Sequence, residues 1–230
     1  MSIPNSASPT KILSTLLLGV LLGSLGAVLV LPVDITWSDS LRNLDIPGDL
    51  RKAINLSEVF AHSLGVLGIL GCVLLICVER RRALVGAVLL TTVAGATSNL
   101  AKASLVRVRP HSRDAIRVVG DEEYQRFLKE RKTATIHNDG IELVLPSLSD
   151  ARLRSFPSGH AATAWGLAVS LTLVFPRGCA MFLLFATLAS MQRILSGAHY
   201  PSDVLAGTSI AFITSATLLS IPQVRRLFER

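Results

Sequence analysis

Residues 179–221 read CAMFLLFATLASMQRILSGAHYPSDVLAGTSIAFITSATLLSI, which is two apolar runs joined by a short polar connection. Each run approaches the roughly 20 residues that an α-helix needs to cross the hydrocarbon core of a bilayer. Arg193, His199 and Asp203 lie in or beside the connection. The stretch therefore predicts two neighbouring membrane helices with a polar cluster at one face of the membrane.

Further apolar runs extend this pattern over most of the 230 residues. Only 17% of the residues are charged, whereas soluble domains carry about a quarter. We expect an all-α protein, a polytopic bundle of six transmembrane helices that forms a single domain over residues 1–230. The expected spans cover residues 12–33, 59–78, 83–106, 157–175, 179–195 and 201–221. The first run is longer than the apolar part of a signal peptide and no A-x-A cleavage pattern follows it, which favours a retained span.

Basic residues are distributed unevenly between the two sides of the predicted bundle. Arg80, Arg81 and Arg82 form the turn between the second and third spans, and Arg225 and Arg226 follow the last span. Because cytoplasmic connections are enriched in Lys and Arg, we expect both termini in the cytoplasm. The net charge of +7 lies in such short clusters and not on one helix face, which argues against nucleic-acid binding.

Three polar clusters lie at span ends on the predicted outer side. Lys102 and Arg109 are seven residues apart and share a helix face. An unpaired charge near the bilayer core costs several kcal/mol, so the two cations predict an anionic partner. The clusters are Lys102 with Arg109-Pro110, Pro157-Ser158-Gly159-His160, and Arg193 with His199 and Asp203.

The second cluster has the pattern of a helix start. Ser158 is a good N-cap residue, and Gly159 permits close approach of a ligand to the backbone. The free N–H groups of a helix N-terminus bind anions. His160 is therefore expected in the first turn, beside a bound anion.

The third cluster supplies a nucleophile. Asp203 follows His199 by four residues, and Pro201 suits the first turn of a helix. A carboxylate bonded to one imidazole nitrogen fixes the tautomer and leaves the other nitrogen free to attack. Arg193 adds a planar donor fork that suits phosphate. Together the clusters match the needs of phosphoryl transfer, which are positioning, charge neutralisation, a nucleophile and an acid.

These motifs resemble the signature of the type 2 phosphatidic acid phosphatase (PAP2) superfamily, which is K-x6-R-P, then P-S-G-H, then S-R-x5-H-x3-D. The resemblance covers residues 102–203, with Gln192 in place of the motif serine. It implies that His199 attacks phosphorus and forms a phosphohistidine, that Asp203 orients His199, and that His160 protonates the leaving oxygen. It also implies that the phosphate oxygens are held by Lys102, Arg109, Ser158, Gly159 and Arg193.

The resemblance further implies an integral membrane enzyme that needs no metal or other cofactor and acts on a membrane lipid phosphate. Undecaprenyl pyrophosphate, phosphatidylglycerophosphate and phosphatidic acid are the candidate substrates. We expect a bacterial inner membrane location with the site facing the periplasm or exterior. A lipid phosphotransferase and an anion or lipid transporter are the alternatives, and the oligomeric state stays open.

The remaining polar residues receive simpler interpretations. Arg107 is expected at the surface, and residues 34–58 form a net acidic outer connection. Glu58 and His62 are expected to make an inter-helix contact, with a place in the pocket as the alternative. The outer loop, residues 107–156, contains a possible helix at 122–132.

Overall fold

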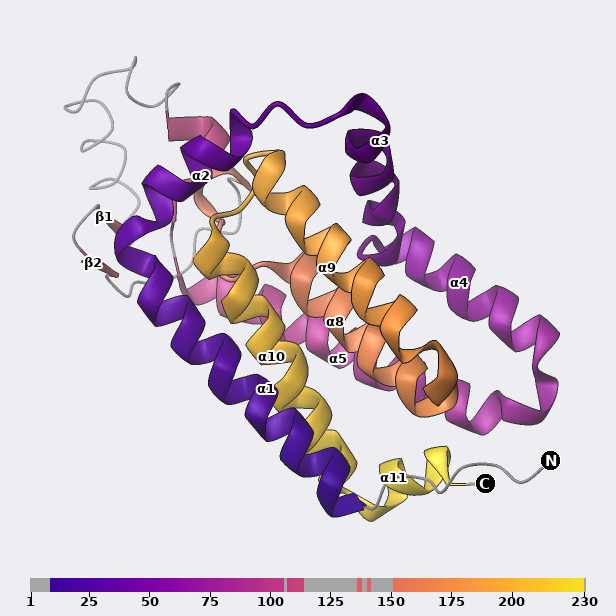
Figure 1. The fold of residues 1–230 in the computed structure, drawn as a ribbon. Coiled ribbons are helices and arrows are strands. Elements are labelled where there is room, and N and C mark those ends of the chain that lie inside the picture. The colour runs from indigo at the N-terminus through magenta and orange to yellow at the C-terminus, as the bar shows by residue number, and fades with distance from the viewer. Residues whose placement is uncertain (1–8, 106, 114–135, 138–139, 142–150, 230) are drawn as a thin grey trace.

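The computed structural model describes residues 9–105, 107–113, 136–137, 140–141 and 151–229, and helices account for nearly all regular structure in these ranges (Figure 1). Strands β1 (Ile136–His137) and β2 (Gly140–Ile141) form a short antiparallel pair. The helix expected at 122–132 lies outside the described residues. The helices are α1 (Pro9–Val30), α2 (Asp34–Arg42), α3 (Gly48–Leu56), α4 (Ser63–Ile76), α5 (Arg81–Ser104), α8 (Gly159–Val174), α9 (Cys179–Leu195), α10 (Pro201–Ser220) and α11 (Pro222–Phe228).

The all-α class is confirmed, but the count of six spans is not. In the described part of the chain, four helical stretches are long and apolar enough to cross a membrane. They are Thr10–Arg42, Val78–Ser104, Pro176–Leu195 and Pro201–Ser220. A fifth is present if the pair Gly48–Phe60 and Ser63–Ile76, bent by 74°, counts as one span. The remaining predicted span corresponds to α8, whose 16 residues make it shorter than the other spanning helices.

Helix α8 is the buried centre of the bundle, packed against α5, α9 and α10. Its small residues make this packing possible, because Ala161, Ala164 and Ala168 are fully buried. Helix α1 runs along α10 on the outside (Figure 1). The fold therefore surrounds α8 with other helices, and the N-terminus of α8 lies beside the ends of its neighbours.

The two ends of the bundle differ in chemistry. The start of α1, helix α11 and the Arg80 turn lie at one end (Figure 1). Arg80 donates a hydrogen bond to the carbonyl oxygen of Val174, and its guanidinium lies 5.0 Å from the centroid of the Phe175 ring. A cation at the last carbonyls of α8 stabilises that helix end. The polar clusters predicted from the sequence lie at the opposite end.

Gly207 sets how closely α10 approaches the start of α8, and this gives a stability prediction. A Cβ at position 207 would overlap the carbonyl oxygen of Ser158, whose own N–H donates to the carbonyl of Asp203 at 2.9 Å. We expect Gly207→Ala to destabilise the protein by about 1–3 kcal/mol, because overpacking forces the two helices apart. Thermal unfolding in detergent measures this change.

Gly68→Ala is the matched control, since a Cβ there meets nothing within 4 Å. Its unfolding temperature should stay level or rise slightly, as alanine favours helix. Equal loss of stability in both variants would contradict the packing argument.

Candidate active site

The predicted polar residues lie where α5 ends, α8 begins, α9 ends and α10 begins. Lys102 lies in the last turn of α5, and Arg193 lies in the last turn of α9. Ser158 is the N-cap of α8 and accepts a hydrogen bond from the Ala161 N–H at 3.3 Å. His199 lies in the α9–α10 connection. The tertiary structure thus brings the three sequence clusters to one end of the bundle.

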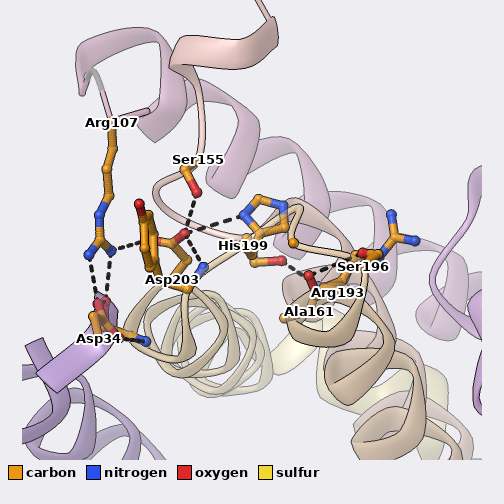
Figure 2. Close-up of polar contacts among 12 residues, drawn as sticks. Asp34, Arg107, Ser155, Ala161, Arg193, Ser196, His199 and Asp203 are labelled. Carbon is orange, nitrogen blue, oxygen red and sulfur yellow. Dashed lines mark hydrogen bonds and ion pairs between the residues drawn. The ribbon is translucent and has the colours of Figure 1, made fainter. Parts of the chain in front are cut away.

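His199 and Asp203 form a fully buried pair (Figure 2). His199 Nδ1 lies 3.5 Å from Asp203 Oδ2, which is longer than a hydrogen bond, and Nδ1 has no hydrogen-bond partner among the described residues. The same oxygen accepts the Tyr200 N–H at 2.8 Å and the Ser155 hydroxyl. Because Nδ1 faces the carboxylate, Nε2 is the imidazole nitrogen left for attack. A hydrogen bond between a catalytic histidine and its carboxylate is often long without substrate and shortens in the reacting complex.

Arg107 is part of this site, so its predicted surface position is wrong. Its guanidinium lies 2.5 Å from Asp203 Oδ1 and stacks on the Tyr200 ring, 4.0 Å from the ring centroid. The backbone explains the burial: the Arg107 N–H donates to the Leu153 carbonyl, and the Ser155 N–H donates to the Arg107 carbonyl. This pairing joins segments about 45 residues apart in the chain, which no local pattern reveals.

Asp34 is a second residue that the sequence placed in a solvated connection and the structure places in the site. Its side chain is 1% exposed. One oxygen lies 2.6 Å from an Arg107 nitrogen, and the other accepts the Ser202 N–H at 2.9 Å. The only local signal is an acidic residue directly after the first apolar run.

The start of α8 forms a compact anion cradle. A Cβ at Gly159 would lie 2.9 Å from Asn99 Oδ1 and 3.6 Å from the Lys102 ammonium nitrogen. The tight contact is with Asn99, so glycine lets the start of α8 pack closely on α5, while the lysine lies at ordinary van der Waals distance. Arg109 follows, with its Nε buried and without a hydrogen-bond partner among the described residues. Free donors and cations around a helix N-terminus suit an oxyanion.

Arg193 is held from two sides. Its Nη2 lies 2.7 Å from Glu58 Oε1, and its Nε donates to Gln192 Oε1 at 2.5 Å. Gln192, which replaces the motif serine, thus orients the adjacent arginine. Glu58 also lies 3.9 Å from His160 Nε2, and the rings of His62 and His160 are 6.4 Å apart. Glu58 and His62 therefore lie beside the site. The sequence had favoured a simple inter-helix contact for these two residues, with a place in the pocket as the alternative.

Two more observations complete the inventory. Arg154 pairs through its backbone with Arg107, and its charge acts on Arg109, so it adds a cation that the motifs do not contain. Among the described residues, no three His, Cys, Asp or Glu side chains are grouped in a way that could hold a metal ion.

Burial lowers the pKa of His199 to about 4, and the cations Lys102 and Arg109 act in the same direction. The neighbouring Asp203 carboxylate opposes this shift. Burial and the neighbouring Arg193 also lower the pKa of Arg109. His199 is therefore neutral at pH 7, which is the form with a free lone pair for attack.

The acid limb of turnover should reflect this pKa. An unperturbed histidine has a pKa of about 6.5, so activity controlled by an ordinary imidazole would fall below that pH. Because the folded-state pKa is lower, we expect the His199-dependent fall only as pH approaches about 4. Because the unfolded chain binds a proton on His199 more readily than the folded protein does, the free energy of unfolding also depends on pH. The contribution of His199 to that free energy is complete above about pH 6.5 and decreases as the pH falls toward 4. A kcat/KM profile between pH 3.5 and 8 measures the limb, and a His199-dependent midpoint near 6.5 would contradict the burial argument.

Comparison with known proteins gives concordant matches. The PAP2 superfamily matches residues 83–227. The lipid A 1-phosphatase of Rhizobium etli is 34% identical over 125 residues, covering 54% of this chain and 44% of that protein. The lipid A 1-phosphatase of Rhizobium johnstonii is 31% identical over 120 residues, which cover 46% of this chain and 49% of that protein. The chain thus spans about half the length of these curated relatives.

A solved structure shares the fold. The crystal structure of Aquifex aeolicus LpxE matches with a TM-score of 0.53 and 21% identity, over 82% of this chain and 95% of that one. At this identity the likeness concerns the arrangement of helices alone.

Proposed function

The chain belongs to the PAP2 superfamily, and from this premise we propose that it is a membrane phosphatase that hydrolyses a phosphate monoester on a lipid through a phosphohistidine at His199. The observation that carries the proposal is the buried His199–Asp203 pair, whose imidazole is neutral at pH 7 and is acted on by the cations Lys102 and Arg109. The residue-by-residue roles that the family resemblance implies are adopted here as part of the proposal.

The reaction has two steps at one phosphorus. In the first, His199 Nε2 forms a bond to phosphorus while the bond from phosphorus to the lipid oxygen breaks. His160, which enters the step as an imidazolium stabilised by the phosphate dianion, gives a proton to that oxygen. Asp203 holds the Nδ1 proton and stabilises the positive charge on the ring. In the second, water attacks phosphorus, its proton passes to His160, and the P–N bond breaks to release inorganic phosphate. Lys102, Arg109 and Arg193 hold the non-reacting oxygens.

The charges of the site favour a doubly charged phosphate. Arg107 is matched by two carboxylates, and Arg193 is matched by Glu58. The site counts five cations against three carboxylates, an excess of two positive charges that matches a phosphate monoester dianion. The cations are Lys102, Arg107, Arg109, Arg154 and Arg193, and the carboxylates are Asp34, Glu58 and Asp203.

The names of the relatives indicate a first substrate to test, the 1-phosphate of lipid A, a sugar phosphate on a lipid anchor. This substrate takes precedence over undecaprenyl pyrophosphate. We also propose a single domain of six crossings, in which α8 crosses within the bundle, shielded from lipid by its neighbours. The arginine-rich end would face the cytoplasm of a bacterial inner membrane, and the site would face the periplasm.

A phosphate-release panel tests the proposal. Purified protein in detergent should release inorganic phosphate from lipid A without added metal, and less readily from phosphatidic acid, phosphatidylglycerophosphate or undecaprenyl pyrophosphate. Orthovanadate should inhibit, since it mimics the five-coordinate transition state. Substrate consumption without free phosphate would instead identify a phosphotransferase, and uptake into liposomes without hydrolysis would identify a transporter. Absence of turnover on every lipid would overturn the proposed function.

A further inference from the structure

A continuous chain of buried charges leads from the first turn of α2 to the catalytic pair (Figure 2). Asp34 contacts Arg107, Arg107 contacts Asp203, and Asp203 faces His199. Asp34 and Asp203 are 1% and 0% exposed, and Arg107 is 8% exposed. Asp34 also lies outside residues 83–227, the region that the superfamily matches.

We propose that Asp34 and Arg107 are positioning residues for His199 and act through the carboxylate of Asp203. The inference rests on the proposed function, because it assigns a task to residues around the same nucleophile. Neither residue touches the phosphate in this assignment.

The geometry supports this role at both oxygens of Asp203. Oδ1 is held by Arg107 Nη1 at 2.5 Å, while Oδ2 accepts the Tyr200 N–H and the Ser155 hydroxyl. A carboxylate with only the Oδ2 contacts could rotate about its Cβ–Cγ bond. The Arg107 contact prevents that rotation, so Oδ2 stays directed at the imidazole.

Asp34 in turn fixes Arg107. Its Oδ2 accepts a hydrogen bond from Arg107 Nη2 at 2.6 Å, and its Oδ1 accepts one from the Ser202 N–H at 2.9 Å. Arg107 Nη1 also donates to the Ser202 hydroxyl at 2.8 Å, and the Tyr200 ring covers one face of the guanidinium. Asp34 therefore ties α2, the arginine and the first turn of α10 into one unit.

The groups that face His199 are Asp203 from α10, Lys102 from α5, Arg109 from the following segment and His160 from α8. Loss of the Arg107 cation leaves the Asp203 carboxylate freer to attract a proton on His199. The acid limb of turnover should then move to higher pH in an Arg107→Met protein. A residue that served only the overall fold would lower the amount of folded enzyme and leave the limb in place.

The chain offers a matched control. Arg113 and Asp39 link the same two segments, since Arg113 Nη1 lies 3.6 Å from Asp39 Oδ2, but this pair is more exposed and does not contact Asp203. The test compares Asp34→Asn, Arg107→Met and Arg107→Lys with Asp39→Asn and Arg113→Met. For each protein, kcat, KM, the acid limb, the unfolding temperature and orthovanadate binding by calorimetry are measured.

We expect kcat to fall about 10–100-fold in Asp34→Asn and Arg107→Met, as is typical when the partners of a site histidine are lost. KM and orthovanadate affinity should change little, because Lys102, Arg109 and Arg193 are intact. Arg107→Lys should recover part of kcat, since it keeps one cation near Asp203. The control variants should retain wild-type kcat.

Three outcomes would overturn the inference: unchanged kcat in Asp34→Asn, equal loss in the control variants, or an unmoved acid limb in folded Arg107→Met. If Arg107→Met does not fold, Asp34→Asn and Arg107→Lys decide the question by kcat. If the wild-type protein releases no phosphate from any lipid, the proposed function fails separately. The inference is then judged by NMR titration of the His199 ring, whose midpoint should be higher in the Arg107→Met protein than in the wild type and unchanged in Arg113→Met.

Discussion

Replacing His199 by alanine should reduce phosphate release by about 10⁴-fold or more, because nothing replaces the group that forms the covalent intermediate. The side chain is buried with Nδ1 toward Asp203, so its other nitrogen is the attacking atom in the proposed reaction. Single-turnover assays with lipid A in detergent measure the loss. Trapping of a phosphorylated protein with wild type, but not with the variant, would identify the intermediate.

The phosphate cradle should survive this change. Lys102, Arg109 and the α8 N-terminus do not depend on the imidazole for their positions, so inorganic phosphate should bind the variant within about tenfold of wild type. Calorimetry checks this binding, and thermal unfolding checks that the variant is folded. Retention of more than a few per cent of turnover by folded His199→Ala protein would rule out the phosphohistidine mechanism.

The second large effect is expected from Asp203→Asn, which should lower kcat by about 10³–10⁴-fold. Asp203 accepts hydrogen bonds from Arg107, Ser155 and the Tyr200 N–H, and it also faces His199. An asparagine amide nitrogen accepts none of these donors, and a neutral side chain no longer stabilises the ring cation. The nucleophile would lose its orientation and its charge partner together.

Stability should fall in the same variant. Donors buried without an acceptor cost about 1–3 kcal/mol each, so the unfolding temperature should drop by several degrees. Asp49→Asn is the matched control, because the Asp49 carboxylate is fully exposed and its one ion pair among the described residues is with Lys52 at 3.3 Å. Normal turnover in Asp203→Asn would show that Asp203 serves the fold and not the reaction.

The sequence alone was sufficient for the helical class, and most of the residues it predicted for the site lie at one end of the bundle. Within each motif, successive site residues are at most seven positions apart in the chain. The His199–Asp203 spacing is an example: Asp203 enters the first turn of α10 after Pro201 and points back at the imidazole. The capping pattern of Ser158 predicted the α8 N-terminus for the same local reason.

The helix face that Lys102 and Arg109 were expected to share is wrong, because α5 ends at Ser104 and the backbone of Arg109 is extended (φ −70°, ψ 147°).

Span length was harder to predict from hydropathy. Apolar composition does not distinguish a helix that faces lipid from one that other helices surround, and α8 has the buried small residues of the second kind. The bend of 74° between Gly48–Phe60 and Ser63–Ile76 is likewise not marked by hydropathy, which carries no information on the direction of a helix axis. The count of six crossings therefore remains a proposal.

The charges that surround the motifs were decided by the tertiary structure. Asp34 is 73 residues from Arg107, and Arg107 is 96 residues from Asp203. A lone charge near a span end is equally compatible with a solvated position and with a buried pair, because the choice depends on whether an opposite charge arrives from elsewhere. The sequence thus identified the residues that are proposed to carry the chemistry, while the packing of α2, α5 and α10 determined which charges contact them.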